Sequence, residues 1–367
     1  MKDEFHSLAV VDIRRETADT VSYGLSAPAQ LRDVLRYRPG QHLPVRAVIE
    51  GREVRRTYSI SSGPEDGHIW ITVKRVAGGL FSTHLHKNLA PGAVLDAMPP
   101  AGRFVVPLEP DQQHVTQERR TYLAIAAGSG ITPIMAMIRH VMAREPGSRF
   151  ALMYGNRSPD SIIFREALED LKDRYLDRLS VMHVLSRDQE PDVPLLGGRI
   201  DGTRIAKLMP AVAPVSEIDH VYLCGPGDLI TSARAALLGM GMARDRIHFE
   251  YFRAGADAAP PRAPSRSVEP SAPSSGAEAV VVMDGARHTF RVPPGTGVVD
   301  AALAAGIRVP YSCKGGMCCT CRAKLVEGEV VMQRNFSLER WEIAAGFVLT
   351  CQAHPQTSRV VLDYDQM

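Results

Sequence analysis

The sequence predicts three domains of different fold class: an antiparallel β-barrel, a doubly wound α/β domain and a small C-terminal α+β domain. Three observations support this division. The N-terminal part alternates apolar and polar residues with period two, the central part alternates strand-like and helix-like segments, and a cysteine-rich loop follows a Pro- and Ser-rich stretch. A chain of 367 residues is long enough for each domain to bury its own core.

Residues 1–112 are predicted to form the barrel. Ile69, Ile71 and Val73 alternate with more polar neighbours, as in a half-buried strand, and turn pairs such as Pro39-Gly40 and Pro91-Gly92 interrupt the segment. From residue 113 to 253 the pattern changes to apolar runs such as TYLAIAA, RFALMYGN and HVYLCGP, which alternate with helical segments such as ITPIMAMIRHVM and ITSARAALLGMG. This alternation predicts a parallel sheet covered by helices on both faces.

Residues 254–277 are rich in Ala, Pro and Ser without apolar periodicity, and we expect a linker there. Residues 278–367 form the third predicted domain. It begins with a hairpin around Asp284-Gly285 and continues with a short helix closed by Gly306.

The composition excludes several classes of function. Lys plus Arg (43) nearly balances Asp plus Glu (41), which argues against a nucleic-acid partner or binding to an anionic membrane. The N-terminal segment has acidic residues before a short apolar run, unlike a secretion signal, and no segment is long enough to span a bilayer. We therefore expect a cytoplasmic protein, in which clustered cysteines bind metal more often than they form disulfides.

The strongest chemical signal is the segment YSCKGGMCCTC. Cys313, Cys318 and Cys321 have the spacing C-x4-C-x2-C, and Cys351 follows after 29 residues, which is the spacing of a plant-type 2Fe-2S centre. Glycines inside the loop allow the backbone to turn its N–H groups toward the cluster. One alternative is a tetrahedral zinc site made of Cys318, Cys321, Cys351 and His354, and another is a purely structural cluster of thiols. In the iron interpretation Cys319 is not a ligand.

Two weaker signals lie in the predicted barrel. In RRTYSIS, Arg56, Tyr58 and Ser59 offer a guanidinium for a phosphate, a ring for stacking and a hydroxyl for a ring nitrogen. In GGLFS, the residues from Gly79 to Ser82 are expected to open a helix whose free N–H groups meet a phosphate. Each signal is also compatible with an ordinary exposed strand or turn.

Two further signals end strands of the predicted parallel sheet, at the edge where such sheets bind ligands. AAGSGITP carries Gly128 and Gly130, with Thr132 expected as the helix N-cap and Pro133 at the first helical position. CGPG places Cys224 at the end of a later strand. A tight structural turn and a small buried cysteine are the simpler interpretations.

The order of these motifs, followed by Glu250 and Phe252, resembles the ferredoxin-NADP reductase superfamily. Together with the cysteine motif, the chain resembles the reductase components of oxygenases that carry a C-terminal plant-type ferredoxin domain of β-grasp fold. The stretches FHSL, YRPGQHL, YGNR, GRIDG, YSCKGG and SLERWEIAAGFVLTCQAHP are most similar to the reductase subunits of phenylacetyl-CoA epoxidases, which act in phenylacetate degradation. This resemblance covers nearly the whole chain except the linker.

The resemblance implies roles for individual residues. It places FAD, or FMN as the alternative, against the barrel residues and the reacting nicotinamide near Cys224, Glu250 and Phe252. It implies catalytic roles for Ser59, Cys224 and Glu250. The cofactor-binding residues that it implies are Arg56, Tyr58, Ser59, Lys74, Gly79, Ser82, Gly128, Gly130, Thr132, Pro133, Arg157, Ser186, Arg187, Cys224, Gly225 and Phe252, and the cluster ligands are Cys313, Cys318, Cys321 and Cys351.

Because Ser186 and Arg187 suit a 2′-phosphate, the expected electron donor is NADPH, with NADH as the alternative. The resulting hypothesis is an enzyme that passes electrons from NADPH through FAD and a 2Fe-2S cluster to an oxygenase, most closely a multi-subunit di-iron phenylacetyl-CoA epoxidase. Two alternatives remain open at this point. One is an NADH-dependent reductase of a steroid or aromatic-ring oxygenase, and the other is a zinc-containing nucleotide-binding module without electron transfer.

Overall fold

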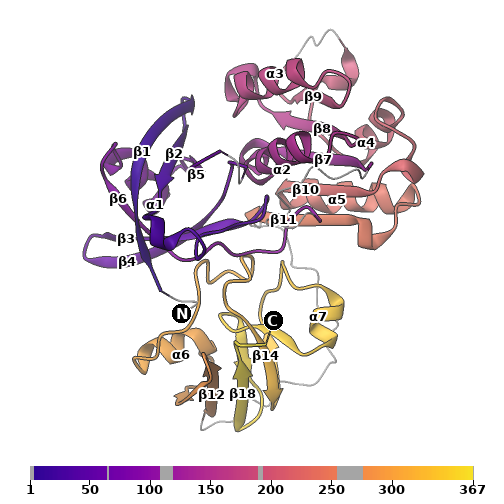
Figure 1. The fold of residues 1–367 in the computed structure, drawn as a ribbon. Coiled ribbons are helices and arrows are strands. Elements are labelled where there is room, and N and C mark those ends of the chain that lie inside the picture. Colours follow the sequence, from indigo (N-terminus) through magenta and orange to yellow (C-terminus); the bar gives the residue numbers. More distant parts are fainter. Residues whose placement is uncertain (1–3, 64–65, 108–118, 189–192, 254–275, 367) are drawn as a thin grey trace. The chain divides into compact units, whose positions relative to one another are not determined.

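The structure is a computed structural model that describes residues 4–63, 66–107, 119–188, 193–253 and 276–366 (Figure 1). It divides into two compact units. The first contains the barrel and the α/β domain, and the second consists essentially of the C-terminal domain. The expected linker, 254–277, lies outside the described residues except for its last two positions, where the first strand of the C-terminal domain begins at Ala277.

The barrel is built from six strands in the order β4-β3-β6-β1-β2-β5. Their bounds are β1 (His6–Thr17), β2 (Thr20–Ser26), β3 (His42–Ile49), β4 (Arg52–Ser59), β5 (Ile69–Lys74) and β6 (Val94–Ala97). An antiparallel bridge between Ile60 and Ile71 joins the two ends of this sheet and closes it. Closure removes the free sheet edges that would otherwise invite aggregation.

The predicted alternation in β5 is confirmed, because Ile69, Ile71 and Val73 are all buried in the barrel core. Helix α1 (Leu80–Asn88) follows the strand and packs Phe81 and Leu85 into the same core. The helix that the sequence predicts after Gly79 is therefore present, and its apolar face fixes it on the barrel.

The α/β domain has a five-stranded parallel sheet in the order β11-β10-β7-β8-β9. Its strands are β7 (Thr121–Ala127), β8 (Arg149–Asn156), β9 (Leu179–Leu185), β10 (His220–Pro226) and β11 (Ile247–Arg253), and its helices are α2 (Ile131–Arg144), α3 (Arg165–Arg174), α4 (Gly202–Leu208) and α5 (Gly227–Gly239). The chain reverses its direction of winding between β7 and β10. Doubly wound sheets bind ligands at the carboxyl ends of the strands on either side of such a switch point.

One prediction about this domain is wrong in detail. Thr132 is not an N-cap, because residues Gly128–Gly130 already turn as a 3-10 helix that runs directly into α2 at Ile131. Thr132 instead donates a hydrogen bond from its hydroxyl to the carbonyl of Ser129 at 3.0 Å. Pro133 occupies the third helical position, where its missing N–H costs nothing because the first turn has no intrahelical partners.

The C-terminal domain combines a five-stranded sheet, order β13-β12-β18-β14-β16, with a two-stranded sheet, β15-β17. Its strands are β12 (Ala277–Met283), β13 (Ala286–Val292), β14 (Arg322–Glu327), β15 (Val330–Met332), β16 (Phe347–Leu349), β17 (Ala353–Pro355) and β18 (Arg359–Asp363), and its helices are α6 (Val298–Ala304) and α7 (Arg340–Ala344). The predicted hairpin is present, with Asp284 and Gly285 both at positive φ. Gly306, at φ +75°, closes α6 as predicted.

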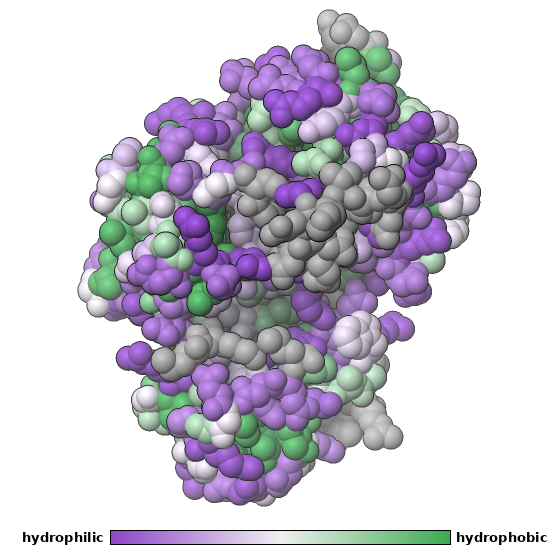
Figure 2. Space-filling model, viewed as in Figure 1, coloured by the Kyte–Doolittle hydropathy of each residue, from purple (hydrophilic) through white to green (hydrophobic). Residues whose placement is uncertain are grey.

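Apolar side chains collect inside the two units rather than on them. The surface in Figure 2 is mostly hydrophilic, with apolar residues scattered over it. Within the described residues, no helix is both long enough and apolar enough to cross a membrane.

Candidate active site and metal centre

The two glycine-containing turns of the α/β domain meet at the switch point of its sheet. A Cβ atom on Gly130 would overlap the backbone carbonyl of Cys224, so the turn after β7 lies directly against the end of β10. Gly225, at the end of β10, would in turn bring a Cβ within 3.3 Å of the Ala127 nitrogen. The structure thus joins two motifs that are far apart in the sequence, and at Gly130 their backbones approach so closely that only glycine fits.

Gly128, unlike Gly130 and Gly225, lies next to open space. Its φ is +54°, which favours glycine, and a Cβ built on it would meet nothing within 4 Å. Its carbonyl accepts a hydrogen bond from the buried Tyr154 hydroxyl at 3.0 Å. Gly128 therefore leaves open space at the carboxyl edge of the sheet, as an approaching ligand would need.

Cys224 and Glu250 are directly paired in register between β10 and β11. Cys224 is fully buried, and this burial raises the pKa of its thiol well above the ordinary value, with a smaller contribution from the Glu250 carboxylate. The thiol is therefore neutral near pH 7. Phe252 lies two residues further along β11 and packs against the core of the α/β domain.

His42 is a residue to which sequence analysis assigned no role. It begins β3, is 3% exposed, and places Nδ1 3.4 Å from Oε1 of Glu250. Among the described residues, neither His42 Nε2 nor Glu250 Oε2 has a hydrogen-bond partner, although both atoms are buried. Buried polar atoms without partners are costly, so they mark a place where a ligand can complete the site.

The barrel residues of RRTYSIS lie on β4 as expected. Arg56 is exposed, Tyr58 is half-buried with its ring 6.1 Å from that of Phe81, and Ser59 is buried at the end of the strand. Arg56 and Tyr58 share one face of β4 because strand side chains alternate. The strand therefore presents a charged fork and an aromatic ring on the same side.

The GGLFS segment opens α1 with Gly79 as its N-cap. A Cβ on Gly79 would come within 2.9 Å of Ser82 Oγ and Val76 Cβ, so a tight fit requires glycine there. Ser82 is buried, and its hydroxyl accepts a hydrogen bond from the Val76 nitrogen at 3.1 Å. Lys74 precedes this turn, but its ammonium lies 3.6 Å from a carboxylate oxygen of Asp19.

The residues expected near a 2′-phosphate come from two neighbouring loops. Ser186 and Arg187 follow β9, and their backbone nitrogens donate to the carbonyls of Asn156 and Arg157, at 2.8 and 2.9 Å. Both arginines are exposed. The fold thus brings Arg157 beside Ser186 and Arg187 at the carboxyl edge of the sheet.

The four cysteines of the predicted metal centre interact in two pairs within the C-terminal domain. A hydrogen bond from the Cys318 thiol lowers the pKa of Cys313 to about 5 and raises that of Cys318, and burial adds to the latter effect. Cys321 acts in the same way on Cys351, lowering its pKa. Backbone N–H groups support the acceptor sulfurs, including that of Gly315, which lies 3.3 Å from Cys313 Sγ. Backbone N–H groups directed at cysteine sulfurs are a feature of iron–sulfur sites, so the surroundings of Cys313 and Cys351 fit such a cluster.

The backbone of the cysteine loop has positive φ at Gly316 and at Cys319. Gly316 has φ +76°, and a Cβ there would come within 2.7 Å of the Arg334 carbonyl oxygen. Cys319 also has positive φ, +55°, and packs half-buried against the domain core.

Comparison with known proteins agrees with this arrangement. Residues 7–106 match the oxidoreductase FAD-binding domain, residues 124–235 the oxidoreductase NAD-binding domain, and residues 281–356 the 2Fe-2S iron–sulfur cluster binding domain. The chain is therefore an oxidoreductase with flavin, pyridine-nucleotide and 2Fe-2S modules.

Individual relatives match nearly the full length of the chain. The chain is 41% identical to a subunit of the 1,2-phenylacetyl-CoA epoxidase of Escherichia coli K12, over 98% of both chains. It is 35% identical to the ferredoxin reductase component of 3-ketosteroid-9-alpha-monooxygenase from Rhodococcus rhodochrous, over 97% of this chain and 96% of that one. Phthalate dioxygenase reductase has the same fold over 98% of both chains, with a TM-score of 0.58 at 24% identity. The protein belongs to the family of flavin- and iron–sulfur-containing reductase components of oxygenases.

The zinc alternative is not supported. All four expected cysteines lie inside the segment that matches the 2Fe-2S domain. His354, which the tetrahedral set requires, pairs with Val331 between β17 and β15 and lines a separate cavity with Pro293 and Thr296. A module without electron transfer is likewise excluded by the family.

Proposed function

We propose that this protein is an NADPH-dependent reductase that passes electrons through FAD and a 2Fe-2S cluster to an oxygenase, specifically the di-iron phenylacetyl-CoA epoxidase. The observation that carries the proposal is the 41% identity to a phenylacetyl-CoA epoxidase component over 98% of both chains. The matched region includes the barrel, the α/β domain and the cysteine domain, so all three domains support the same role.

The barrel residues supply the flavin site in this proposal. Arg56 binds the flavin phosphates with its guanidinium, Tyr58 stacks on the ring system and Ser59 donates its hydroxyl near N5. Gly79 and Ser82 open α1, whose free N–H groups receive the pyrophosphate. Because the Lys74 ammonium is paired with the Asp19 carboxylate, we expect Lys74 to contribute only indirectly to flavin binding.

The switch point supplies the nucleotide site. Gly128, Gly130, Thr132 and Pro133 form one wall, and Cys224 and Gly225 form the opposite wall. When bound, the flavin accepts a hydride from the nicotinamide and releases electrons one at a time to the cluster. The close packing of Gly130 on the Cys224 carbonyl holds the two walls together, and Phe252 on β11 borders the flavin side.

Glu250 and His42 carry the ionisable chemistry of this site. The Glu250 carboxylate stabilises positive charge that develops on the nicotinamide, and its contact with His42 Nδ1 fixes its orientation. The neutral Cys224 thiol packs beside them without adding a charge. Among the described residues His42 Nε2 has no hydrogen-bond partner, so this buried atom is open to a contact with the bound ligand.

The choice of NADPH is supported by the two loops after β8 and β9. Arg157 and Arg187 are both exposed, and the backbone hydrogen bond between them keeps the two loops, including Ser186, side by side. Guanidinium groups bind phosphates bidentately, so this set favours a 2′-phosphate over a free ribose hydroxyl.

In the C-terminal domain, Cys313, Cys318, Cys321 and Cys351 hold the cluster. Backbone N–H groups of residues 313–318 stabilise the sulfurs. Gly316 allows this loop to pack closely against the backbone of Arg334. This domain is the part that meets the oxygenase. A reductase of a steroid oxygenase is the second candidate, because the 3-ketosteroid monooxygenase component is 35% identical over 97% of this chain.

An anaerobic titration tests the proposal. NADPH is expected to bleach the flavin absorbance first and the cluster absorbance next, and NADH to do so with lower affinity. Reconstitution with the oxygenase subunits of each candidate system, followed by product analysis, identifies the acceptor. A flavin that dithionite reduces but neither nucleotide reduces contradicts the proposed role.

A further inference from the structure

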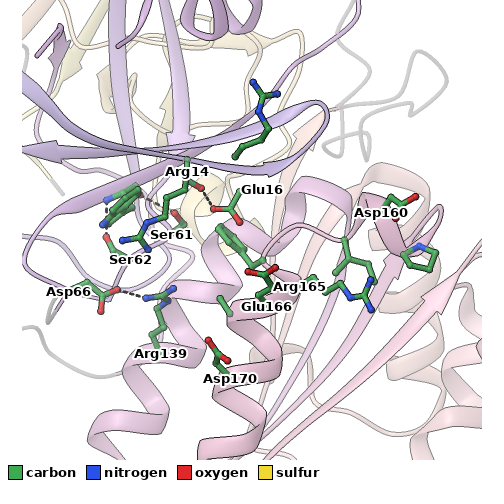
Figure 3. Close-up of a pocket in the computed structure, with 17 residues that line it drawn as sticks. Arg14, Glu16, Ser61, Ser62, Asp66, Arg139, Asp160, Arg165, Glu166 and Asp170 are labelled. Carbon is green, nitrogen blue, oxygen red and sulfur yellow. Dashed lines mark hydrogen bonds and ion pairs between the residues drawn. The ribbon is translucent and has the colours of Figure 1, made fainter. Parts of the chain in front are cut away.

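A cavity of about 430 Å³ lies between the barrel and the α/β domain within the first unit (Figure 3). Ser61, Ser62 and Trp70 line it from the barrel, and Arg139 and Arg165 line it from α2 and α3. Because side chains leave this part of the seam unfilled, the polar contacts beside the cavity matter for how the two domains are held together.

An ion pair crosses the seam beside this cavity. Arg139 Nη1, on α2, lies 3.0 Å from Oδ2 of Asp66, on the barrel, and Figure 3 shows this contact as a dashed line. The two side chains are only 29% and 28% exposed, so water and salt screen the pair less than a fully exposed one. The Arg139 Nε atom is buried and has no hydrogen-bond partner among the described residues, so the guanidinium depends on its contact with Asp66.

The barrel side of the ion pair is joined to the strand end that carries Ser59. The backbone N–H of Gly63 donates to the same oxygen of Asp66 at 2.9 Å, and the buried Tyr37 hydroxyl donates to the Gly63 carbonyl at 2.7 Å. Residues 60–62, between Ser59 and Gly63, are all buried. These contacts fix Asp66 relative to the end of β4.

The other side of the ion pair belongs to the helix that follows the nucleotide turn. The 3-10 turn Gly128–Gly130 runs directly into α2 at Ile131, and Arg139 lies about two turns further along the same helix. Its neighbours Met137 and Ile138 are fully buried in the core of the α/β domain. Close packing makes such a core rigid, so α2 and the nucleotide turn form one rigid segment that carries Arg139.

We propose that Asp66 and Arg139 are positioning residues for hydride transfer: their ion pair holds α2 and its nucleotide turn against the barrel, and so sets the nicotinamide against the flavin. This inference rests on the proposed function, which assigns the flavin to the end of β4 and the nicotinamide to the turn before α2. Neither residue has a contact with a reacting group in that assignment. Small displacements between reacting atoms lower rates strongly, so loss of the ion pair acts on the rate of hydride transfer.

Stopped-flow measurement of anaerobic flavin reduction at saturating NADPH tests the proposal. Asp66→Asn keeps an oxygen for the Gly63 N–H but removes the charge, and Arg139→Met removes the guanidinium at similar side-chain length. Each variant is expected to lower the rate by about fivefold or more, whereas Arg139→Lys keeps the positive charge and stays within about twofold of the wild type. Kd for NADPH, taken from the concentration dependence of the rate, is expected to change less than about threefold, because the nucleotide residues lie within one domain.

Arg165→Met is the matched control, with an unchanged rate expected. Arg165 lines the same cavity, but it pairs with Glu169 at 3.2 Å within α3 and makes no ion pair across the seam. The double variant Asp66→Asn/Arg139→Met is expected to be no slower than the slower single variant, because both substitutions remove the same interaction. Losses that multiply in the double variant would show that the two residues act separately and would overturn the proposal.

Salt separates an electrostatic link from a general packing defect. Ions screen a partly exposed pair, so raising KCl from about 0.05 M to about 0.5 M is expected to slow flavin reduction about twofold in the wild type and in Arg165→Met. Asp66→Asn and Arg139→Met lack the pair, and their rates are expected to change little. The same salt dependence in all four proteins would contradict the proposal.

A wild-type rate in Asp66→Asn would also overturn it, as would an equal loss in Arg165→Met. If Arg139→Met does not fold, Asp66→Asn decides by its rate and its salt dependence. Failure of the wild-type protein to reduce its flavin with either NADPH or NADH is a different result, because it rejects the proposed function and this inference with it. Normal reduction in the wild type with unchanged rates in both variants rejects the inference alone.

Discussion

His42 Nδ1 lies 3.4 Å from Oε1 of Glu250, although 208 positions separate the two residues in the sequence. One residue opens a barrel strand, and the other lies on the last strand of the parallel sheet. Gly102 stacks against the imidazole so closely that a Cβ there would come within 2.8 Å of the ring. This contact brings an imidazole and a carboxylate together at the edge where the flavin and nicotinamide are proposed to meet.

Glu250→Gln removes the negative charge but keeps the shape of the side chain. We expect flavin reduction at saturating NADPH to slow by about 10- to 100-fold, because a carboxylate near a developing positive charge contributes a few kcal/mol to the transition state. Anaerobic stopped-flow absorbance measures this rate. Glu217→Gln, an exposed site on the same domain, is the control, and an unchanged rate in Glu250→Gln would remove Glu250 from the chemistry.

Gly130→Ala introduces a methyl group where the Cys224 carbonyl already lies. The turn and the end of β10 must separate, so nucleotide affinity is expected to fall at least tenfold and the thermal midpoint to drop by several degrees. Gly239→Ala is the matched control, since a Cβ at the end of α5 meets nothing within 4 Å. That change is expected to leave affinity unchanged and to add about 0.5–1 kcal/mol to the free energy of unfolding. Equal behaviour of the two alanine variants would disprove the steric argument.

Arg187→Ala tests the choice between the two nucleotides. Loss of a charged hydrogen bond to the 2′-phosphate costs about 1.5–3 kcal/mol, so KM for NADPH is expected to rise roughly 10- to 100-fold while KM for NADH changes little. Steady-state reduction of ferricyanide measures both constants. Arg174→Ala, an exposed arginine at the end of α3, controls for general charge. An equal increase of KM for NADPH and for NADH would show that Arg187 does not bind the 2′-phosphate.

Cys319→Gly tests whether the extra cysteine is a ligand. The residue has φ +55°, a conformation that glycine adopts without strain, so we expect two irons per chain, an unchanged electron paramagnetic resonance signal and a gain of about 1 kcal/mol in stability. Cys318→Ala, in contrast, is expected to lose both the irons and the signal. Iron loss in Cys319→Gly with iron retained in Cys318→Ala would reverse the assignment.

The His220–His248 pair predicts a pH dependence of stability. Burial and the neighbouring His220 lower the pKa of His248 to about 4, so between this value and about 6.5 the unfolded chain binds more protons than the folded one. Stability therefore falls as the pH falls, by about 2 kcal/mol between pH 7 and pH 5 from this residue. Urea unfolding at the two pH values measures the loss. His248→Gln, which cannot be protonated, is expected to lose about 2 kcal/mol less than the wild type, and an identical loss would refute the assignment.

Local patterns in the sequence were sufficient for much of the fold. The runs TYLAIAA, RFALMYGN and HVYLCGP correspond to β7, β8 and β10 with the same first and last residues. Such strands are apolar on both faces and bounded by turn residues, so their limits can be read directly. The start of α2 could not be predicted in this way. The 3-10 turn Gly128–Gly130 precedes the helix and takes the place of the side-chain cap that Thr132 was expected to provide.

The sequence by itself determined the three modules, the cysteine spacing and the glycine turns, because each depends on residues that are close together along the chain. Tertiary structure decided which distant residues meet. Gly130 lies against Cys224, and His42 lies against Glu250. These contacts depend on strand order and on how the barrel packs against the parallel sheet. No local pattern encodes them, since each partner alone has the sequence environment of an ordinary strand or turn residue.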